Sequence, residues 1–304
     1  QATGYALGQI LVGINVAWGG SSTTNVIGNT ICSLTNNAQG GVATKTDQTI
    51  GIYVGGYNNY VSGNTIFNLS TATLNNTNSS VSGNTAALTG ISEYCNSSLL
   101  HDINKNTIYN LTATNPQFAG VVNGIKSFIS YQTGNSKFNS NFIYNLNLDA
   151  SSVGASVYGI NLVSAYNTYT YNNIISIGEN VPATYYGISV NNGINGLKYE
   201  FFNTVNIKGN PASNAYNSYA FYDDNNLTLY THLVKNNLFT NNRSNSNSAS
   251  GKHYATYYNY DLTANGYLSQ DYNNYYVSGT GGVMAGAFSG TVREVNQLPI
   301  FVSP

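Results

Sequence analysis

Charged side chains are scarce in this sequence. Asp, Glu, Lys and Arg make up 7% of the 304 residues, and the formal net charge is -1, whereas soluble globular chains usually carry about 25% charged residues. Nucleic acids are bound through clustered Lys and Arg, and anionic membrane surfaces attract basic patches. The composition therefore excludes both as partners.

Cysteines and long apolar runs are also scarce. Cys32 and Cys95 fall at different positions of the repeat described below, so no disulfide is implied and both are expected to be buried free thiols. No apolar run approaches the roughly 20 residues of a membrane-spanning helix, so membrane insertion is not expected. The sequence starts at Gln1 without Met, so we expect either a removed leader or a piece of a longer chain.

Asn, Ser, Thr, Gly and Tyr dominate what is present, with 31 Gly and 27 Tyr. Asn and Gly accept left-handed turns, while Thr and Tyr favour strands. This mixture predicts many short strands joined by turns. Low-complexity disorder is the alternative, and it is disfavoured because apolar positions recur in register.

A strand pattern recurs about every 34 residues. A small residue is followed by alternating apolar residues, as in GINV at Gly13, GIYV at Gly51, GINL at Gly159 and GISV at Gly187. The period of two places the Ile, Val and Leu side chains on one inward face.

A second pattern begins with Asn, as in NTIFNL at Asn64, NTIYNL at Asn106 and NFIYNL at Asn141. Equivalent residues of stacked coils lie about 4.8 Å apart, so an Asn at one corner can pass a side-chain hydrogen bond to the next coil. Asn also tolerates the left-handed turn at such a corner. Ligand binding is the alternative role. The expected structural ladder is Asn64, Asn106, Asn141, Asn172, Asn203 and Asn236.

Three short strands per unit predict an all-β fold, a right-handed parallel β-helix of about eight coils of roughly 34 residues. We expect a single domain over residues 1–304, with clear coils in 13–277 and an irregular segment in 278–304. A propeller blade would need more strands per unit, and a leucine-rich repeat would be shorter.

Tyrosines directly precede the small residue in four successive units: Tyr158, Tyr186, Tyr219 and Tyr254. They should stack along one edge of the coils, with the small neighbour leaving room for each ring. Packing is the favoured role of this row, and contact with a glycan is the alternative.

The ionisable residues show no clear catalytic arrangement. Glu93 and Asp223 fall in the same slot four coils apart, about 19 Å at the usual strand spacing, which is too far to cooperate directly. Asp223 and Asp261 form a weak carboxylate cluster on successive coils. His101, His232 and His253 show no metal-ligand spacing and are expected at surface or edge positions. No catalytic residue, metal or cofactor is predicted. Enzymatic activity is therefore left open, and the absence of an enzyme function is the favoured interpretation.

The GIxV strands, the N-T-I-x-N-L turns and the coil length resemble the pectate-lyase-like right-handed parallel β-helix superfamily. The resemblance runs from about Gly13 to Asn273. The Asn-rich style, with DYNNYYVSG and a closing LPIFVSP, is similar to secreted or cell-surface repeat proteins of Bacteroidetes-type bacteria. The superfamily resemblance implies the fold but no particular activity, because the superfamily includes polysaccharide lyases, glycoside hydrolases, tailspikes, adhesins and passive scaffolds.

Two functions are compatible with these observations. The first is an extracellular or cell-surface structural or adhesive β-solenoid that self-associates, end to end or laterally, as a surface or filament component; the near-zero net charge favours association. The second is a polysaccharide lyase-like or hydrolase-like enzyme, or a glycan-binding module, that uses its Tyr-rich faces on surface glycans.

Overall fold

The structure is a computed structural model of the 304-residue chain. It describes residues 9–16, 23–37, 47–75, 86–95, 100–129, 134–163, 166–191, 196–211, 215–224, 231–245, 250–259 and 268–286.

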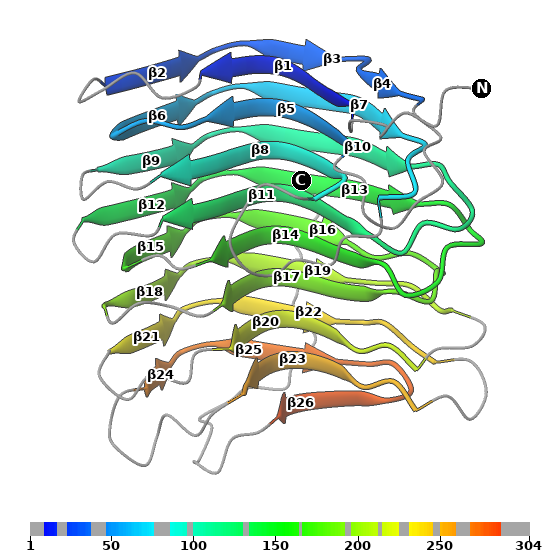
Figure 1. Cartoon of the computed structure of the whole chain (residues 1–304). Helices are drawn as coiled ribbons and strands as arrows, with labels where there is room; N and C mark the ends of the chain where they lie inside the picture. Colours follow the sequence, from blue (N-terminus) through cyan, green and yellow to red (C-terminus); the bar gives the residue numbers. More distant parts are fainter. Residues whose placement is uncertain are drawn as a thin grey trace, which may run out of the picture.

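Three parallel sheets run the length of the molecule, and the chain visits them in turn, so that each coil lies beneath the previous one (Figure 1). Sheet A contains, in spatial order, β1 (Ile10–Val16), β5 (Gln48–Val54), β8 (Leu88–Cys95), β11 (Val121–Ile129), β14 (Ser156–Val163), β17 (Thr184–Asn191), β20 (Ser218–Asp224), β23 (His253–Tyr258) and β26 (Gly282–Gly286).

Sheet B follows sheet A along each coil. Its strands, in spatial order, are β2 (Thr23–Ile27), β6 (Asn58–Ser62), β9 (His101–Asn104), β12 (Asn135–Asn139), β15 (Asn167–Tyr171), β18 (Lys198–Phe201), β21 (His232–Lys235) and β24 (Leu268–Asp271).

Sheet C completes each coil. It contains β3 (Thr30–Cys32), β7 (Thr65–Thr71), β10 (Thr107–Ala113), β13 (Phe142–Leu148), β16 (Ile174–Ile177), β19 (Thr204–Ile207), β22 (Leu238–Asn241) and β25 (Asn274–Val277), and the short β4 (Thr35–Asn36) also pairs with β7.

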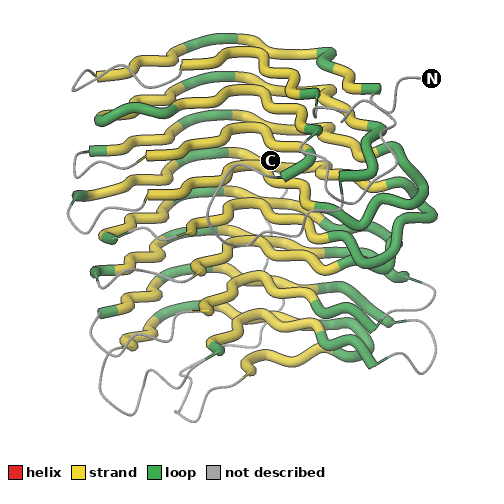
Figure 2. The backbone as a smooth tube through the Cα atoms, viewed as in Figure 1, coloured by secondary structure: helices red, strands yellow, loops and turns green. Residues whose placement is uncertain are grey.

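The predicted all-β parallel β-helix is therefore confirmed, and no helix occurs in the described ranges. The strand count differs slightly from the eight coils expected, because sheet A has nine strands. The ninth, β26, lies within 278–304, which was expected to be irregular. The described connections from sheet C to sheet A gather along one side of the solenoid (Figure 2).

The glycine of the GIxV pattern allows sheet A to pack closely against sheet C. A Cβ on Gly159, which follows Tyr158, would lie 2.6 Å from the carbonyl oxygen of Gly187 and 2.6 Å from Cγ2 of Ile175. The small residue thus faces the interior, not the Tyr ring that precedes it, and this corrects the role expected for it. The following Ile is fully buried in coil after coil, which stabilises each coil by about 1.5–3 kcal/mol.

The N-T-I-x-N-L pattern combines a corner with a left-handed residue inside the strand of sheet C. A residue with positive φ turns the chain from sheet B to sheet C, and the next residue is the ladder Asn. These turning residues are Gly28, Gly63, Lys105, Ser140, Asn172, Phe202, Asn236 and Tyr272. The second Asn of the pattern, as at Asn68, Asn110 and Asn145, also has positive φ. This left-handed residue returns the following Leu to the core, because it shifts the alternation by one residue.

Candidate functional site

Ionisable side chains gather inside the solenoid where sheet A turns into sheet B. One inward row of sheet A runs Val54, Glu93, Ser127, Leu162, Val190, Asp223 and Tyr258. The row of sheet B that faces it runs Asn59, His101, Ser136, Thr168, Lys198, His232 and Leu268. The sheet A row is apolar at Leu162 and Val190, between Ser127 and Asp223, so the ionisable residues form two separate clusters.

The upper cluster joins Glu93 to His101. Glu93 Oε1 lies 2.8 Å from His101 Nδ1, and both side chains are buried. Asn59 Nδ2 donates to Glu93 Oε1 at 3.0 Å, and Ser127 Oγ donates to Oε2 at 2.7 Å. Burial alone would raise the pKa of Glu93, but the His101 charge and these hydrogen bonds outweigh it and leave the pKa lowered. The charge of Glu93 overcomes the burial of His101 and raises its pKa to about 10.

The lower cluster places His232 between two carboxylates. His232 Nδ1 lies 2.8 Å from Asp223 Oδ2, and Nε2 contacts Glu200 Oε2; all three side chains are at most 1% exposed. The two acids overcome the effect of burial and raise the pKa of His232 to about 10. Burial, aided by the nearby Asp223 charge, keeps the pKa of Glu200 raised although His232 lowers it.

Lys198 adds a fourth ionisable group to this cluster. It is fully buried in register with His232, and its Nζ donates to the carbonyl oxygen of Tyr166. Burial lowers the pKa of Lys198 to about 8, against the opposing charges of Glu200 and Asp223. With every group ionised the cluster is neutral, which limits the cost of burying its charges.

These clusters contain the residue types of an acid–base site, but a substrate cannot reach them. A general acid or base must come within about 3 Å of a substrate atom, and the clustered side chains are enclosed by the three sheets. All three histidines are buried, which corrects the expected surface or edge positions. The sequence contained a signal for this burial, the alternation HDI at His101 and HLV at His232. Residues two apart in a strand share a face, so His101 faces inward with Ile103, and His232 with Val234.

His253 belongs to a different interior contact. Its Nδ1 lies 2.9 Å from Ser218 Oγ and its Nε2 lies 2.8 Å from Asn245 Oδ1. Burial, with the nearby charges of Arg243 and Lys252, lowers its pKa to about 4. His253 is therefore neutral at pH 7, unlike His101 and His232.

An open groove lies where sheet C turns into the loops that lead to sheet A. Its volume is about 590 Å³, and its lining includes Leu148, Glu179, Val181 and Lys208. Glu179 Oε2 accepts a hydrogen bond from the Leu148 amide at 3.0 Å, and burial raises the pKa of Glu179. The groove thus combines a carboxyl group, an exposed ammonium group and apolar walls.

Arg243 holds the loop that forms this groove. Its guanidinium donates to the carbonyl oxygens of Glu179 at 2.8 Å and Val181 at 2.6 Å, and it lies 4.5 Å from the centre of the Tyr185 ring. Its side chain is fully buried. Arg243 is a positioning residue for the loop, because its charge does not reach the solvent.

The Asn ladder passes through Asn29, Asn64, Asn106, Asn141, Asn173, Asn203, Asn237 and Asn273, with Nδ2 to Oδ1 distances of 2.9 to 3.1 Å. Asn172 and Asn236, which the sequence placed in the ladder, are instead the turning residues with positive φ, and their neighbours Asn173 and Asn237 take the ladder positions. Because both amide hydrogens and the oxygen of Asn141 are used within the protein, it has little capacity left for a ligand.

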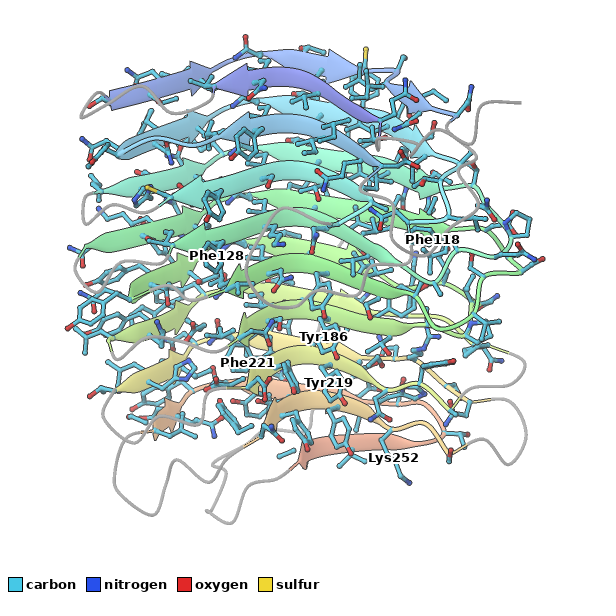
Figure 3. The ribbon with its side chains drawn as sticks, viewed as in Figure 1. Phe118, Phe128, Tyr186, Tyr219, Phe221 and Lys252 are labelled. Carbon is cyan, nitrogen blue, oxygen red and sulfur yellow. The ribbon has the colours of Figure 1, made fainter. Side chains whose placement is uncertain are left out.

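The tyrosine row stacks ring on ring. Tyr158, Tyr186, Tyr219 and Tyr254 have centroid separations of 4.5, 5.0 and 5.3 Å and interplanar angles of at most 14°. Figure 3 labels Tyr186 and Tyr219 on the neighbouring strands β17 and β20. A sugar stacks on the face of an aromatic ring, and inside this row each face already meets another ring, which weakens the role of the row as a glycan platform.

A second aromatic stack lies on the outer face of sheet C. Phe67, Tyr109 and Tyr144 are separated by 5.1 and 4.9 Å, with interplanar angles of at most 3°. Beside it, Asn110 Nδ2 donates to Asn68 Oδ1 and Asn145 Nδ2 donates to Asn110 Oδ1. The outer surface here is built from stacked rings and amides rather than charges.

The remaining sequence expectations have mixed outcomes. Asp261 lies outside the described residues, so its pairing with Asp223 stays a prediction. No disulfide joins Cys32 and Cys95; Cys95 is buried as expected, but Cys32 is exposed, which corrects its expected burial.

The described residues contain neither a metal site nor a membrane-spanning helix. No group of three or more His, Cys, Asp or Glu side chains there could hold a metal ion. In the same residues, no helix is long and apolar enough to cross a membrane.

The fold and its interior define the chain as a parallel β-solenoid with a partly ionic core. Comparisons with family models, curated proteins and solved structures find no match for it. The architecture fits the pectate-lyase-like fold, and this agreement rests on the stacked parallel sheets alone.

Proposed function

We propose that this chain is an extracellular or cell-surface β-solenoid with a structural or adhesive role, and that it self-associates instead of catalysing a reaction. The observation that carries the proposal is the enclosure of the His–carboxylate clusters, which are at most 1% exposed. Groups that could perform acid–base chemistry on a substrate serve here to hold coils together.

The outer face of sheet C supplies a surface for lateral association. Phe142 is 41% exposed and lies in register with Ile174, which is 50% exposed. Burying such side chains between two copies is favourable by about 25 cal/mol per Å² of apolar surface, and a net charge near zero opposes association little.

Self-association is tested by light scattering coupled to size exclusion, with negative-stain images, over a range of protein concentrations. Rods or fibres that lengthen or bundle with concentration are expected. Ile174→Lys should weaken lateral bundling, whereas Thr23→Lys, an equal charge on the exposed surface of sheet B, should not. Monodisperse single rods at every concentration would contradict the proposal.

Surface location is a separate test. Protease treatment of intact cells from the source, followed by detection with an antibody, should remove the protein if it is extracellular. Complete protection in intact cells, with cleavage after lysis, would contradict this part of the proposal.

Glycan binding is a second candidate, and the groove beside Glu179 favours it. A carboxyl group, an amide and an ammonium group above apolar walls can bind the hydroxyls and the apolar face of a sugar. A glycan array should then give hits that Glu179→Gln abolishes and that Asp271→Asn, in β24 of sheet B, leaves in place. No hits for the wild-type protein would remove this candidate.

A further inference from the structure

The interior face of sheet B changes from apolar to polar side chains between β12 and β15. An inward row runs Val61, Ile103, Phe138, Thr170, Glu200 and Val234. Phe138 fills the core in its coil, whereas the next residue of the row, Thr170, has a much smaller side chain. The space inside β15 and β18 is therefore bounded by polar groups in place of an aromatic ring.

Three polar atoms in this space lack a hydrogen-bond partner. They are Thr168 Oγ1, Thr170 Oγ1 and Glu200 Oε1, and all three residues are fully buried. Thr170 is in register with Glu200, and Thr168 with Lys198, so the three atoms come from adjacent strands. A buried polar group left without a partner destabilises the fold, and three such atoms on one inward face of neighbouring strands point to a shared partner.

We propose that Thr168, Thr170 and Glu200 hold an ordered water molecule inside the solenoid, between β15 and β18. The donors and acceptors are complementary. Each threonine hydroxyl can donate to the water oxygen, and the water can donate to Glu200 Oε1. Buried waters in proteins make two to four such bonds. The proposal is independent of the function proposed above.

The surrounding charges select water over a cation. His232 and Lys198 already oppose the charges of Glu200 and Asp223, so a further cation would meet two positive groups at close range. Water adds no charge, and it solvates the one oxygen of Glu200 that His232 does not contact.

The test is a high-resolution crystal structure of the wild-type protein combined with oxygen-17 relaxation dispersion, which counts long-lived internal waters. Density within hydrogen-bonding distance of the three atoms is expected. Thr170→Val keeps the shape of the side chain but removes its hydroxyl, and it should lose one relaxation-active water.

Two further variants guard against a general effect of the substitution. Thr170→Ser retains the hydroxyl and should retain the water. Thr49→Val removes a buried hydroxyl that already donates to the carbonyl oxygen of Ser70, so it should leave the count of internal waters unchanged. Absence of density at the site in the wild-type protein, or an unchanged water count in Thr170→Val, would overturn the proposal.

Discussion

The upper and lower ionic clusters differ in their number of carboxylates. Glu93 faces one histidine and takes two further hydrogen bonds from neutral side chains, and its pKa is lowered. Glu200 shares His232 with Asp223, and its pKa is raised. Both acids are fully buried, so the difference comes from two sources: the two hydrogen bonds that Glu93 accepts from neutral side chains, and the Asp223 charge beside Glu200. The comparison shows that one buried histidine offsets the charge of one carboxylate. The charge of the second carboxylate in the lower cluster is offset by Lys198.

The largest effect is expected from His232→Gln. This change leaves Glu200 and Asp223 buried without their central cation, and breaking a buried ion pair in this way costs about 3–5 kcal/mol. His101→Gln should cost less, because Glu93 keeps its bonds from Asn59 and Ser127. Urea unfolding of the two variants measures the difference, and equal losses would show that the extra carboxylate has no energetic consequence.

Alkaline pH should weaken the folded state. Both histidines have a folded pKa of about 10, above the usual 6.5, so their stabilisation is complete below pH 6.5 and is lost as the pH rises towards 10. Lys198 acts in the opposite sense: its pKa is lowered to about 8, so the cost of its buried charge is relieved from pH 8 upwards.

The free energy of unfolding, measured by urea titration from pH 6 to pH 10, should therefore fall in the wild-type protein. Lys198→Met removes the opposing contribution, so its stability should fall more steeply over the same range. A wild-type stability that rises between pH 7 and pH 10 would contradict the charged state of the two histidines.

The Asn ladder crosses both regions and should be equally important in each. Asn106→Ala in the upper coils and Asn203→Ala in the lower coils each leave neighbouring amides without partners, at a cost of about 1–3 kcal/mol. Unequal costs would show that the ionic clusters influence the corner.

A pair of adjacent residues provides the matched control for the ladder. Asn173→Ala should cost as much as the other ladder variants, whereas Asn172→Gly should change stability by no more than about 0.5 kcal/mol, because Asn172 is exposed and has positive φ. Thermal melts of both variants distinguish the two positions.

Among the destabilising variants, the smallest effects are expected in the aromatic stacks. Tyr186→Leu removes two stacked ring contacts and an edge contact with Tyr222 in the lower coils, and Tyr109→Leu removes two stacked contacts in the upper coils. Each should cost about 0.5–1.5 kcal/mol beyond the change in burial. A larger loss of stability for Tyr109→Leu would indicate that the outer stack of sheet C also orders the coils beneath it.

The periodic positions could be predicted from the sequence, and the non-periodic ones could not. Inward residues such as Ile160 and Val190 follow from alternation alone, as does the stacking of Tyr158 on Tyr186. The ladder was misplaced at Asn172 and Asn236 because an Asn follows each of them, and only the backbone decides which of two consecutive Asn residues turns the corner.

The ionic clusters were missed for a different reason. Glu200 and His232 lie on adjacent strands but are separated by 32 residues, and no period of the repeat relates an acid in one coil to a histidine in the next. The repeat relates acids at similar positions of successive coils, such as Asp223 and Asp261, whereas the pairing of Asp223 with His232 crosses from one sheet to another.

The direction of the Asn ladder distinguishes the two ends of the solenoid. Every described bond runs from Nδ2 of one coil to Oδ1 of the following coil, so the amide dipoles all point the same way along the axis. A second copy that extended this chain of dipoles would have to join head to tail, since two like ends would oppose donor to donor or acceptor to acceptor. Head-to-tail contacts along a straight axis do not close into a ring, and an axial assembly built this way would be an open, polar filament.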